Sequence, residues 1–287
     1  MRNISNSPRL LELKKKRRKI FLVKFLIFGL GFLIFFLVLA YISRIDKLNI
    51  NGFKIIGNKV VETGVIRDVV EEKLEGYYLW LFPKKNIFLY PKGGVVDILS
   101  DRFKRLKDIN ITSKDGKILE ISVSERIPEY IWCGEGLPET GADIETCYFL
   151  DNTGFIFDEA PYFSGEVYFK FFGKVTTEND ISSGVYFSET NFHKFISFKK
   201  LLEDMKLKPV ALYIMDNGEV KVYLSDLSPL PMGPEIIFKV DFDFQKIAEN
   251  LQAALTTEPL QTDFKNKYSS LLYIDLRYGN KVYYKFR

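Results

Sequence analysis

An uninterrupted apolar stretch near the N-terminus constrains this chain more than any other feature. Phe25 to Ile42 is eighteen residues without a charge, and the apolar run extends back to Ile20 across the single Lys24. At 1.5 Å per helical residue, the uncharged stretch is about 27 Å long and the extended apolar run about 35 Å. Either length is enough to cross the hydrocarbon core of a bilayer. A lone segment in lipid must be helical, because its backbone has to satisfy its own hydrogen bonds. The sequence therefore predicts a transmembrane helix over residues 20–43.

The charges around this stretch predict its direction. Residues 1–24 carry nine Lys/Arg and one Glu, whereas the rest of the chain carries 32 Lys/Arg and 36 Asp/Glu. Positive flanks stay in the cytoplasm. Residues 1–19 are therefore expected to form a cytoplasmic basic tail that contacts anionic lipid headgroups, and residues 44–287 to lie outside. Within the tail, residues 1–13 lack apolar periodicity and are expected to be disordered. A basic run beside a span needs no nucleic acid to explain it, and none is expected as a partner.

A secretory signal peptide is the competing interpretation of the same stretch. Val38-Leu39-Ala40 has the small residue that a cleavage site needs. However, the basic region is nineteen residues long, and the apolar run exceeds the usual 7–15 residues of a signal peptide. These lengths favour an uncleaved anchor.

Apolar periodicity divides the segment that follows the anchor into five elements. It predicts a strand around 48–55, a helix from Thr63 that ends at Gly76, a second helix over 95–106, and strands around 109–111 and 119–123. A three-stranded sheet with two helices on one face would bury every apolar stripe.

The pattern beyond Pro128 is mostly that of β-strands. Strand patterns occur over 130–133, 147–150, 155–157, 167–172, 210–215, 220–224, 236–240, 271–277 and 281–286. Two helices are expected, over 190–205 and 243–256. The fold class is therefore α+β: one N-terminal transmembrane helix, a β-α-α-β-β domain, and a mostly antiparallel β domain with two helices.

Several motifs in this order resemble those of the FtsQ/DivIB bacterial cell-division proteins. Residues 48–126 resemble the POTRA domain that follows the membrane anchor in that family. The matching pieces are Phe53–Asn58, Pro83–Phe88, Phe103–Leu106 and Ile121–Pro128. Residues 128–287 resemble the β domain of the same family, through Phe149–Phe157 and Tyr273–Arg277. The domains implied are 1–19, 20–43, 44–127 and 128–287.

The resemblance implies a scaffold protein without enzymatic activity. Members of this family cross the cytoplasmic membrane once and act at the division septum. They bind the small coiled-coil proteins FtsB/DivIC and FtsL through the last strands of the β domain, and they help to localise and regulate septal peptidoglycan synthesis. Two alternatives remain open: a POTRA-containing protein of outer-membrane assembly or secretion, and an anchored envelope hydrolase.

Catalytic motifs give the enzyme alternative little support. His193 is the single histidine, and it lies in a helical pattern between Phe192 and Phe195. No serine has the glycine pattern of a nucleophile elbow, and no Lys-Ser/Thr follows Gly93-Gly94 as a phosphate loop requires. We expect no catalytic residues, no cofactor, no metal and no small-molecule substrate.

The two cysteines, Cys133 and Cys147, lie at the facing ends of two strands expected to pair. Outside the cytoplasm the default for such a pair is a disulfide, and two buried free thiols are the alternative. Between the domains, Glu125-Arg126 is either a solvated surface pair or part of a hinge.

The C-terminal hairpin is the expected partner-binding surface. An exposed edge strand offers unpaired backbone groups to which a partner can add a strand. Alternation places Tyr273, Asp275 and Arg277 on one face of the first strand, where a structural role in the sheet is as plausible as partner contact. In the last strand, alternation leaves open whether Val282 and Tyr284 or Tyr283 and Lys285 are exposed. The candidate binding residues are Tyr273, Asp275, Arg277, Val282, Tyr283 and Tyr284.

Overall fold

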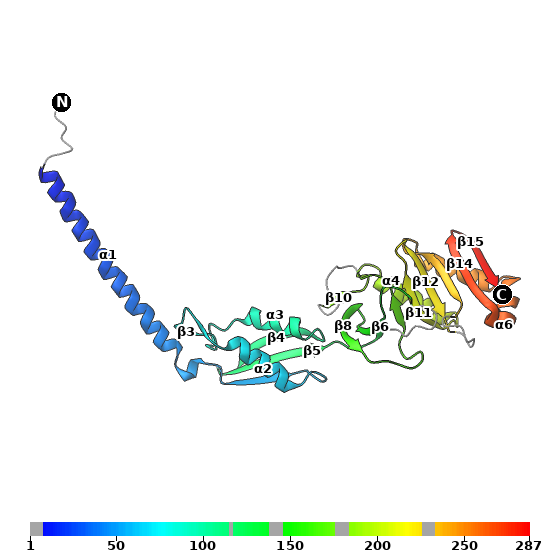
Figure 1. Ribbon diagram of the computed structural model, residues 1–287, viewed down its shortest axis with the longest axis horizontal. Coiled ribbons are helices and arrows are strands. Elements are labelled where there is room, and N and C mark those ends of the chain that lie inside the picture. The colour runs from blue at the N-terminus through cyan, green and yellow to red at the C-terminus, as the bar shows by residue number, and fades with distance from the viewer. Residues whose placement is uncertain (1–7, 115–116, 138–145, 176–183, 226–232) are drawn as a thin grey trace, which may run out of the picture. The chain divides into compact units, whose positions relative to one another are not determined.

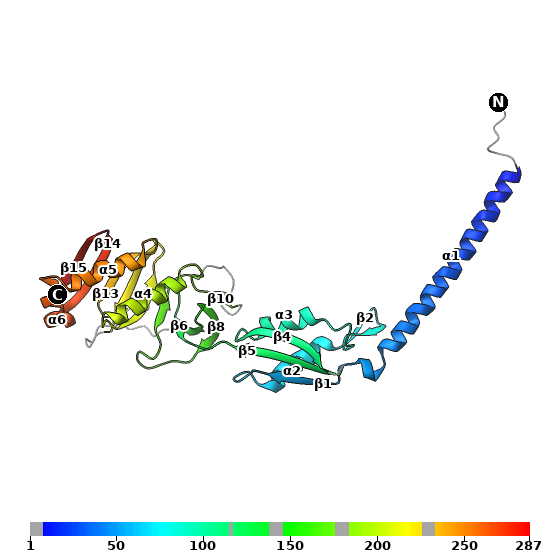
Figure 2. The same ribbon diagram turned by 180° about the vertical axis from the view of Figure 1, so that it is seen from behind.

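A computed structural model of the chain describes residues 8–114, 117–137, 146–175, 184–225 and 233–287 (Figures 1 and 2). It has an α+β fold, with a long apolar helix near the N-terminus and a large, mostly antiparallel sheet with several helices. The chain divides into two compact units. The first runs to Arg102 and includes Asp108–Ser124, and the second contains Phe103–Lys107 and Glu125–Arg287.

Helix α1 spans Pro8–Ser43 and contains the whole apolar run. Its stretch Glu12–Ser43 is long and apolar enough to cross a membrane, and almost all of its side chains are exposed. The expectation of disorder over residues 1–13 is wrong from Pro8 onward. Leu, Lys and Arg are good helix formers, and proline is well suited to the first helical position, so the basic run continues the helix. Residues 1–7 lie outside the described part of the chain.

After α1, the first unit contains a small mixed sheet and two helices. In chain order its main elements are β1 (Gly52–Ile56), α2 (Thr63–Leu74), α3 (Lys92–Arg102), β4 (Leu106–Lys114) and β5 (Ile118–Glu125). The strand order is β1-β5-β4, and β1 runs parallel to β5. Its buried apolar residues include Ile66, Val69, Val70, Leu74, Val95, Leu99, Ile111, Leu119 and Ile121.

Two details of this unit differ from the sequence-based expectation. The second helix ends at Arg102, not at Leu106, because Leu106 is already the buried first residue of β4. Its spacing from Val95 and Leu99 fits a helix, but pairing in the sheet overrides that pattern. The connection between the two helices also carries a short hairpin, β2 (Tyr77–Tyr78) and β3 (Phe82–Pro83), where only a loop was expected.

The second unit is built on a ten-stranded sheet with the order β10-β8-β7-β6-β9-β11-β12-β13-β14-β15. Most neighbours are antiparallel; β6–β9, β9–β11 and β13–β14 are parallel. The strands are β6 (Tyr130–Trp132), β7 (Cys147–Leu150), β8 (Phe155–Ala160), β9 (Lys170–Phe172), β10 (Val185–Tyr186), β11 (Pro209–Ile214), β12 (Glu219–Leu224), β13 (Glu235–Lys239), β14 (Leu271–Tyr278) and β15 (Lys281–Phe286).

Three helices accompany this sheet among the described residues, one more than expected. They are α4 (Phe192–Asp204), α5 (Phe244–Leu255) and α6 (Leu260–Lys267). Side chains of α4 and α5 share the largest apolar core with β12, β13 and β14; for example, the rings of Phe198 and Phe238 are 4.8 Å apart. Helix α6 was missed because Leu260 is its single buried residue, so it has no apolar stripe to recognise.

The carboxylate of Asp151 anchors the start of the second unit. Asp151 is 2% exposed and binds the guanidinium of Arg126 at 2.5 Å, while its other oxygen accepts hydrogen bonds from Thr153 and from the backbone N–H of Phe155. The guanidinium also lies 3.8 Å from the ring centroid of Phe155. Arg126 is therefore largely buried inside this unit and does not form a solvated surface pair.

A disulfide joins Cys133, just after β6, to Cys147 at the start of β7 (S–S 2.02 Å). It crosses between two paired strands on the side of the sheet where Ile131 and Phe149 form a second apolar core. It closes a loop with a sequence separation of 14 residues.

The Cys133→Ser/Cys147→Ser variant is expected to lose about 3 kcal/mol of unfolding free energy, because opening a loop of this length restores entropy to the unfolded chain. In a unit of this size that corresponds to a fall of about 6–12 °C in melting temperature. Thermal unfolding followed by near-ultraviolet circular dichroism measures it. A reductant should shift the melting temperature of the natural chain equally, and should not change that of the variant.

Candidate interaction surface

Strand β15 is the edge of the ten-stranded sheet among the described strands, and its one strand neighbour there is β14. The backbone N–H of Arg287 donates to the carbonyl of Ser270 at 2.8 Å, which fixes the side that faces β14. Consecutive residues of a strand direct their backbone groups to opposite sides. The backbone N–H and C=O groups of Tyr283 and Lys285 therefore point toward β14. Those of Val282, Tyr284 and Phe286 point to the outer edge of the sheet. This edge offers three donors and three acceptors for an added strand.

The two faces of the sheet formed by β12, β13, β14 and β15 carry different kinds of side chain. On one face, Val282, Tyr284 and Phe286 pack against the main apolar core. The other face, which we call the open face, carries the alternate residues. Cross-strand pairing aligns them in two rows, Lys221–Ile237–Asp275–Tyr283 and Tyr223–Glu235–Tyr273–Lys285. Tyr223, Ile237 and Asp275 are buried in these rows, and Tyr223 belongs to the second apolar core. The remaining residues make the open face a mixture of charged and aromatic side chains, which is typical of interfaces that also remain soluble when free.

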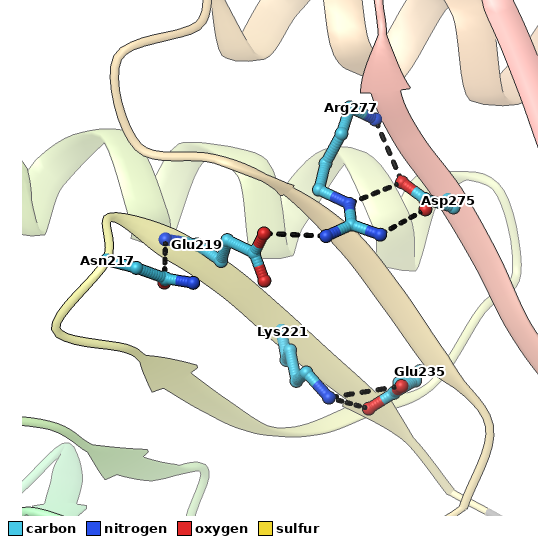
Figure 3. Close-up of polar contacts among 6 residues, drawn as sticks. All are labelled: Asn217, Glu219, Lys221, Glu235, Asp275 and Arg277. Atoms are coloured by element: carbon cyan, nitrogen blue, oxygen red, sulfur yellow. Dashed lines mark hydrogen bonds and ion pairs between the residues drawn. The ribbon is translucent and has the colours of Figure 1, made fainter.

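An ion network on the open face connects three strands (Figure 3). Arg277 holds both carboxylate oxygens of Asp275, with Nε–Oδ1 at 2.9 Å and Nη2–Oδ2 at 2.6 Å. Its remaining Nη1 reaches Glu219 of β12 at 2.6 Å. Beside it, Lys221 binds both oxygens of Glu235 at 3.2 and 3.0 Å. This network fixes the side chains and links β12 to β14 across β13.

Exposed tyrosines lie beside this network at the end of the β14–β15 hairpin. The rings of Tyr278 and Tyr283 meet edge to face at 5.2 Å, and both side chains are at least half exposed. The carbonyl of Gly279 in the turn accepts a hydrogen bond from Asn250 of α5 at 3.0 Å. Rigid, exposed aromatic pairs are common anchors of protein interfaces.

The six residues named from the sequence thus fall on different faces. Tyr273, Asp275 and Tyr283 share the open face by register, and Arg277 joins them through its contacts with Asp275. Val282 and Tyr284 are half-buried on the core face, so they present backbone rather than side chains at the edge. Asp275 is 5% exposed, which places it in the sheet's ion network and leaves it little surface of its own.

The sequence did not point to three members of the ion network: Glu219, Lys221 and Glu235. Glu219 and Lys221 alternate with buried Val220 and Val222, so their face could have been assigned. Their partners could not, since these lie 14 and 58 residues away along the chain.

The Asp275 carboxyl gives the second unit a predicted pH dependence. Burial alone would raise its pKa, but hydrogen bonds from the side chain and backbone of Arg277 outweigh burial, and the pKa is lowered. A lowered folded-state pKa stabilises the fold above the unfolded-state value near 3.9, and this stability is lost as the pH falls through the folded value. At pH 7, Asp275→Asn should cost about 1–3 kcal/mol of unfolding free energy.

Denaturant unfolding at several pH values measures this contribution. The difference between the natural chain and Asp275→Asn should shrink as the pH falls from about 5 to below 3.9. A difference that stays constant across this range would show that the carboxylate charge is not what stabilises the sheet.

His193 is exposed on α4, and its backbone carbonyl accepts a hydrogen bond from Ser197 at 2.9 Å. Among the residues that the structure describes, no three His, Cys, Asp or Glu side chains are grouped so that they could hold a metal ion.

Comparison of the sequence with models of protein families and with curated proteins finds no match.

Proposed function

We propose that this chain is a single-pass membrane scaffold of the bacterial cell-division machinery, similar in role to the FtsQ/DivIB proteins. It binds small coiled-coil division proteins of the FtsB/DivIC and FtsL types outside the cytoplasmic membrane. Through them it helps to localise and regulate septal peptidoglycan synthesis. The observation that carries the proposal is the outer edge of β15, unpaired among the described strands, beside a rigid, mixed open face.

The long apolar helix supports the membrane part of the proposal. Helix α1 exposes its apolar side chains, and the basic run precedes the uncharged stretch. Apolar surface on this scale is stable in lipid and unfavourable in water. With its positive flank inside, residues 44–287 lie outside the cytoplasm.

The first unit supports its assignment as a POTRA-type domain. Its order β1-α2-α3-β4-β5 matches the β-α-α-β-β order that the resemblance implies. Fold alone does not specify function, so this unit supports the proposed scaffold function only in combination with the membrane anchor and the second unit.

The second unit supports partner binding by strand addition. The outer backbone groups of β15 give affinity, and the neighbouring open face with Tyr283 and Arg277 gives specificity. An extended segment of a partner would continue the sheet beyond β15. The ion network keeps the open face ordered before binding, which lowers the entropic cost of association.

Purification of the tagged full chain from native membranes tests this function. We expect small single-pass coiled-coil division proteins to co-purify after mild detergent extraction, and a fluorescent fusion to gather at the septum. A reporter that is active only outside the cytoplasm should be active when fused after Arg287. An even distribution around the cell without division proteins in the eluate would exclude the proposed role.

A further inference from the structure

The β2–β3 hairpin of the first unit exposes large apolar side chains at its tip. Outside α1, the most exposed large apolar side chains of this unit are Trp80 at 90%, Phe88 at 79% and Leu79 at 71%. Leu79 and Trp80 occupy the turn between β2 and β3. Leu79 and Trp80 are adjacent and form an exposed apolar patch, a feature that is typical of sites of contact with a membrane or a partner protein.

The hairpin is attached to the end of α1. In both views it lies beside the last turns of this helix (Figures 1 and 2). The rings of Phe82 in β3 and Phe36 in α1 meet edge to face at 5.2 Å. Phe36, Ala40 and Ser43 are the residues between Leu13 and Ser43 that are not exposed, and their spacing places them on one side of the helix. That side faces the hairpin.

Hydrogen bonds hold the hairpin tip at the helix end. The guanidinium of Arg44 donates to the backbone carbonyls of Leu81 at 3.2 Å and Trp80 at 3.4 Å. The same guanidinium lies 5.6 Å from the ring centroid of Tyr77. The tip therefore has a defined position relative to the apolar run.

Two buried asparagines complete this attachment. The side-chain amides of Asn49 and Asn86 both donate to the carbonyl of Ser43, at 3.3 and 2.9 Å, and so cap the helix C-terminus. Backbone hydrogen bonds also join Ile87 to Leu48 and Ile50 to Lys85, each at 2.9 Å. The segment after the helix and the segment after the hairpin are thus one ordered structure.

The contact with Phe36 places the hairpin at the depth of the membrane boundary. Phe36 is six residues before Ile42, where the apolar run ends, which corresponds to about 9 Å along the helix. If α1 spans the bilayer, Phe82 lies at the edge of the hydrocarbon region, and Trp80 is close to it. Tryptophan prefers this boundary, because its ring is apolar and its N–H can reach polar headgroups.

The backbone of the tip is also unusual. Leu79 and Trp80 both have left-handed φ values, 49° and 58°. Side chains disfavour this conformation, and turns that need it normally contain Gly, Asn or Asp. Strained backbone of this kind persists where it presents side chains for a function.

From the exposure, the attachment and the depth, we propose that Leu79 and Trp80 insert into the outer headgroup–acyl boundary of the bilayer that α1 crosses. The hairpin is then a second membrane contact, which restrains rotation and tilt of the first unit relative to the lipid surface. This inference rests on the membrane anchor of the proposed function, but it does not depend on the identity of any division partner.

Tryptophan fluorescence of the full chain in lipid vesicles tests the insertion. The chain has two tryptophans, and Trp132 is 3% exposed, so the Trp132→Phe variant leaves Trp80 as the single reporter. The vesicles contain phosphatidylethanolamine and phosphatidylglycerol with a phosphatidylcholine brominated near the glycerol end of its acyl chains. We expect blue-shifted emission, strong quenching by the brominated lipid, and little quenching by aqueous iodide.

Two matched reporters, each in a Trp80→Phe/Trp132→Phe background, separate the outcomes. Phe32→Trp in α1 reports the anchor and should be quenched by lipid brominated deeper in the chain. Tyr162→Trp replaces a side chain of the second unit that is 85% exposed and should be quenched by iodide.

If the α1 reporter is quenched by lipid while Trp80 behaves like the Tyr162→Trp reporter, the insertion is refuted and the anchor stands. Trp80 would then be a contact for a partner protein rather than for lipid. If neither the α1 reporter nor Trp80 is quenched by lipid, the anchor and the inference fail together.

Discussion

The Val282→Pro variant is expected to bind the proposed division partner about tenfold more weakly, while the second unit keeps its fold. Alternation along β15 directs the backbone N–H of Val282 to the outer edge, so we expect the substitution to remove a donor that β14 does not use. An added strand would be left with an unpaired carbonyl, which costs about 1–3 kcal/mol, and it would also meet the proline ring. A loss of about 1.4 kcal/mol is a tenfold change in affinity.

Two further variants control this experiment. Val282→Thr keeps the backbone donor and a β-branched side chain, so it should bind like the natural chain. Tyr283→Pro instead removes a donor directed toward β14 and should destabilise the hairpin itself. Binding is measured by titrating the full chain in detergent with the external segment of the FtsB/DivIC-type protein from the same cell. Equal affinities for Val282→Pro and Val282→Thr would place the interface elsewhere.

The Asp151→Ala variant is expected to lose a large part of the stability of the second unit. It would leave the guanidinium of Arg126 buried without its carboxylate and would orphan the backbone N–H groups of Thr153 and Phe155. Breaking one side of a buried ion pair costs about 3–5 kcal/mol. For a unit of this size, the melting temperature should fall by on the order of 10 °C.

Asp158→Ala is the matched control. Asp158 pairs with Arg105 at 2.7 Å, and the side chains are 36% and 12% exposed, respectively. Water can replace part of the contact at the more exposed Asp158 carboxylate, so its loss should cost less than the loss of Asp151. Unfolding of the second unit is followed by the emission of Trp132 in a Trp80→Phe background. Equal melting temperatures for the two variants would mean that the Arg126–Asp151 contact does not hold the start of this unit together.

Local patterns in the sequence predict those elements whose apolar residues repeat with a clear period. Helix α5 is an example: the side chain of Asp243 caps its first turn, and the helix buries Ile247 and Leu251 at helical spacing. The β11–β12 hairpin follows the same logic, with a turn at Asn217-Gly218 between two alternating strands.

The missed elements lack such a period or depend on distant contacts. The β2–β3 hairpin has two-residue strands and is held by α1 and by Arg44, whose hydrogen bond to Leu81 joins positions far apart in sequence. The end of α3 was misplaced because Leu106 fits a helical stripe but is buried in β4. Short-range patterns cannot decide between two elements that would both bury the same side chain.

The sequence could predict which strands carry the candidate surface, but it could not predict which side chains contact one another there. Alternation placed Tyr273, Asp275 and Arg277 on one face, but it could not show that Arg277 directs its donors to Asp275 and Glu219. It also left open the exposed face of the last strand, which depends on the side of the sheet that α5 covers. The outer backbone groups of β15 follow from register, which no single strand's sequence specifies.

Site-specific photocrosslinking in living cells tests the central claim most directly. A photoreactive amino acid replaces Tyr283 on the open face beside the edge, and in a parallel strain it replaces Tyr186 on β10, at the opposite edge of the sheet. We predict a crosslink from position 283 to a small single-pass coiled-coil division protein, and none to that protein from position 186. A division protein captured from position 186 alone, or from neither position, would contradict partner binding at β15.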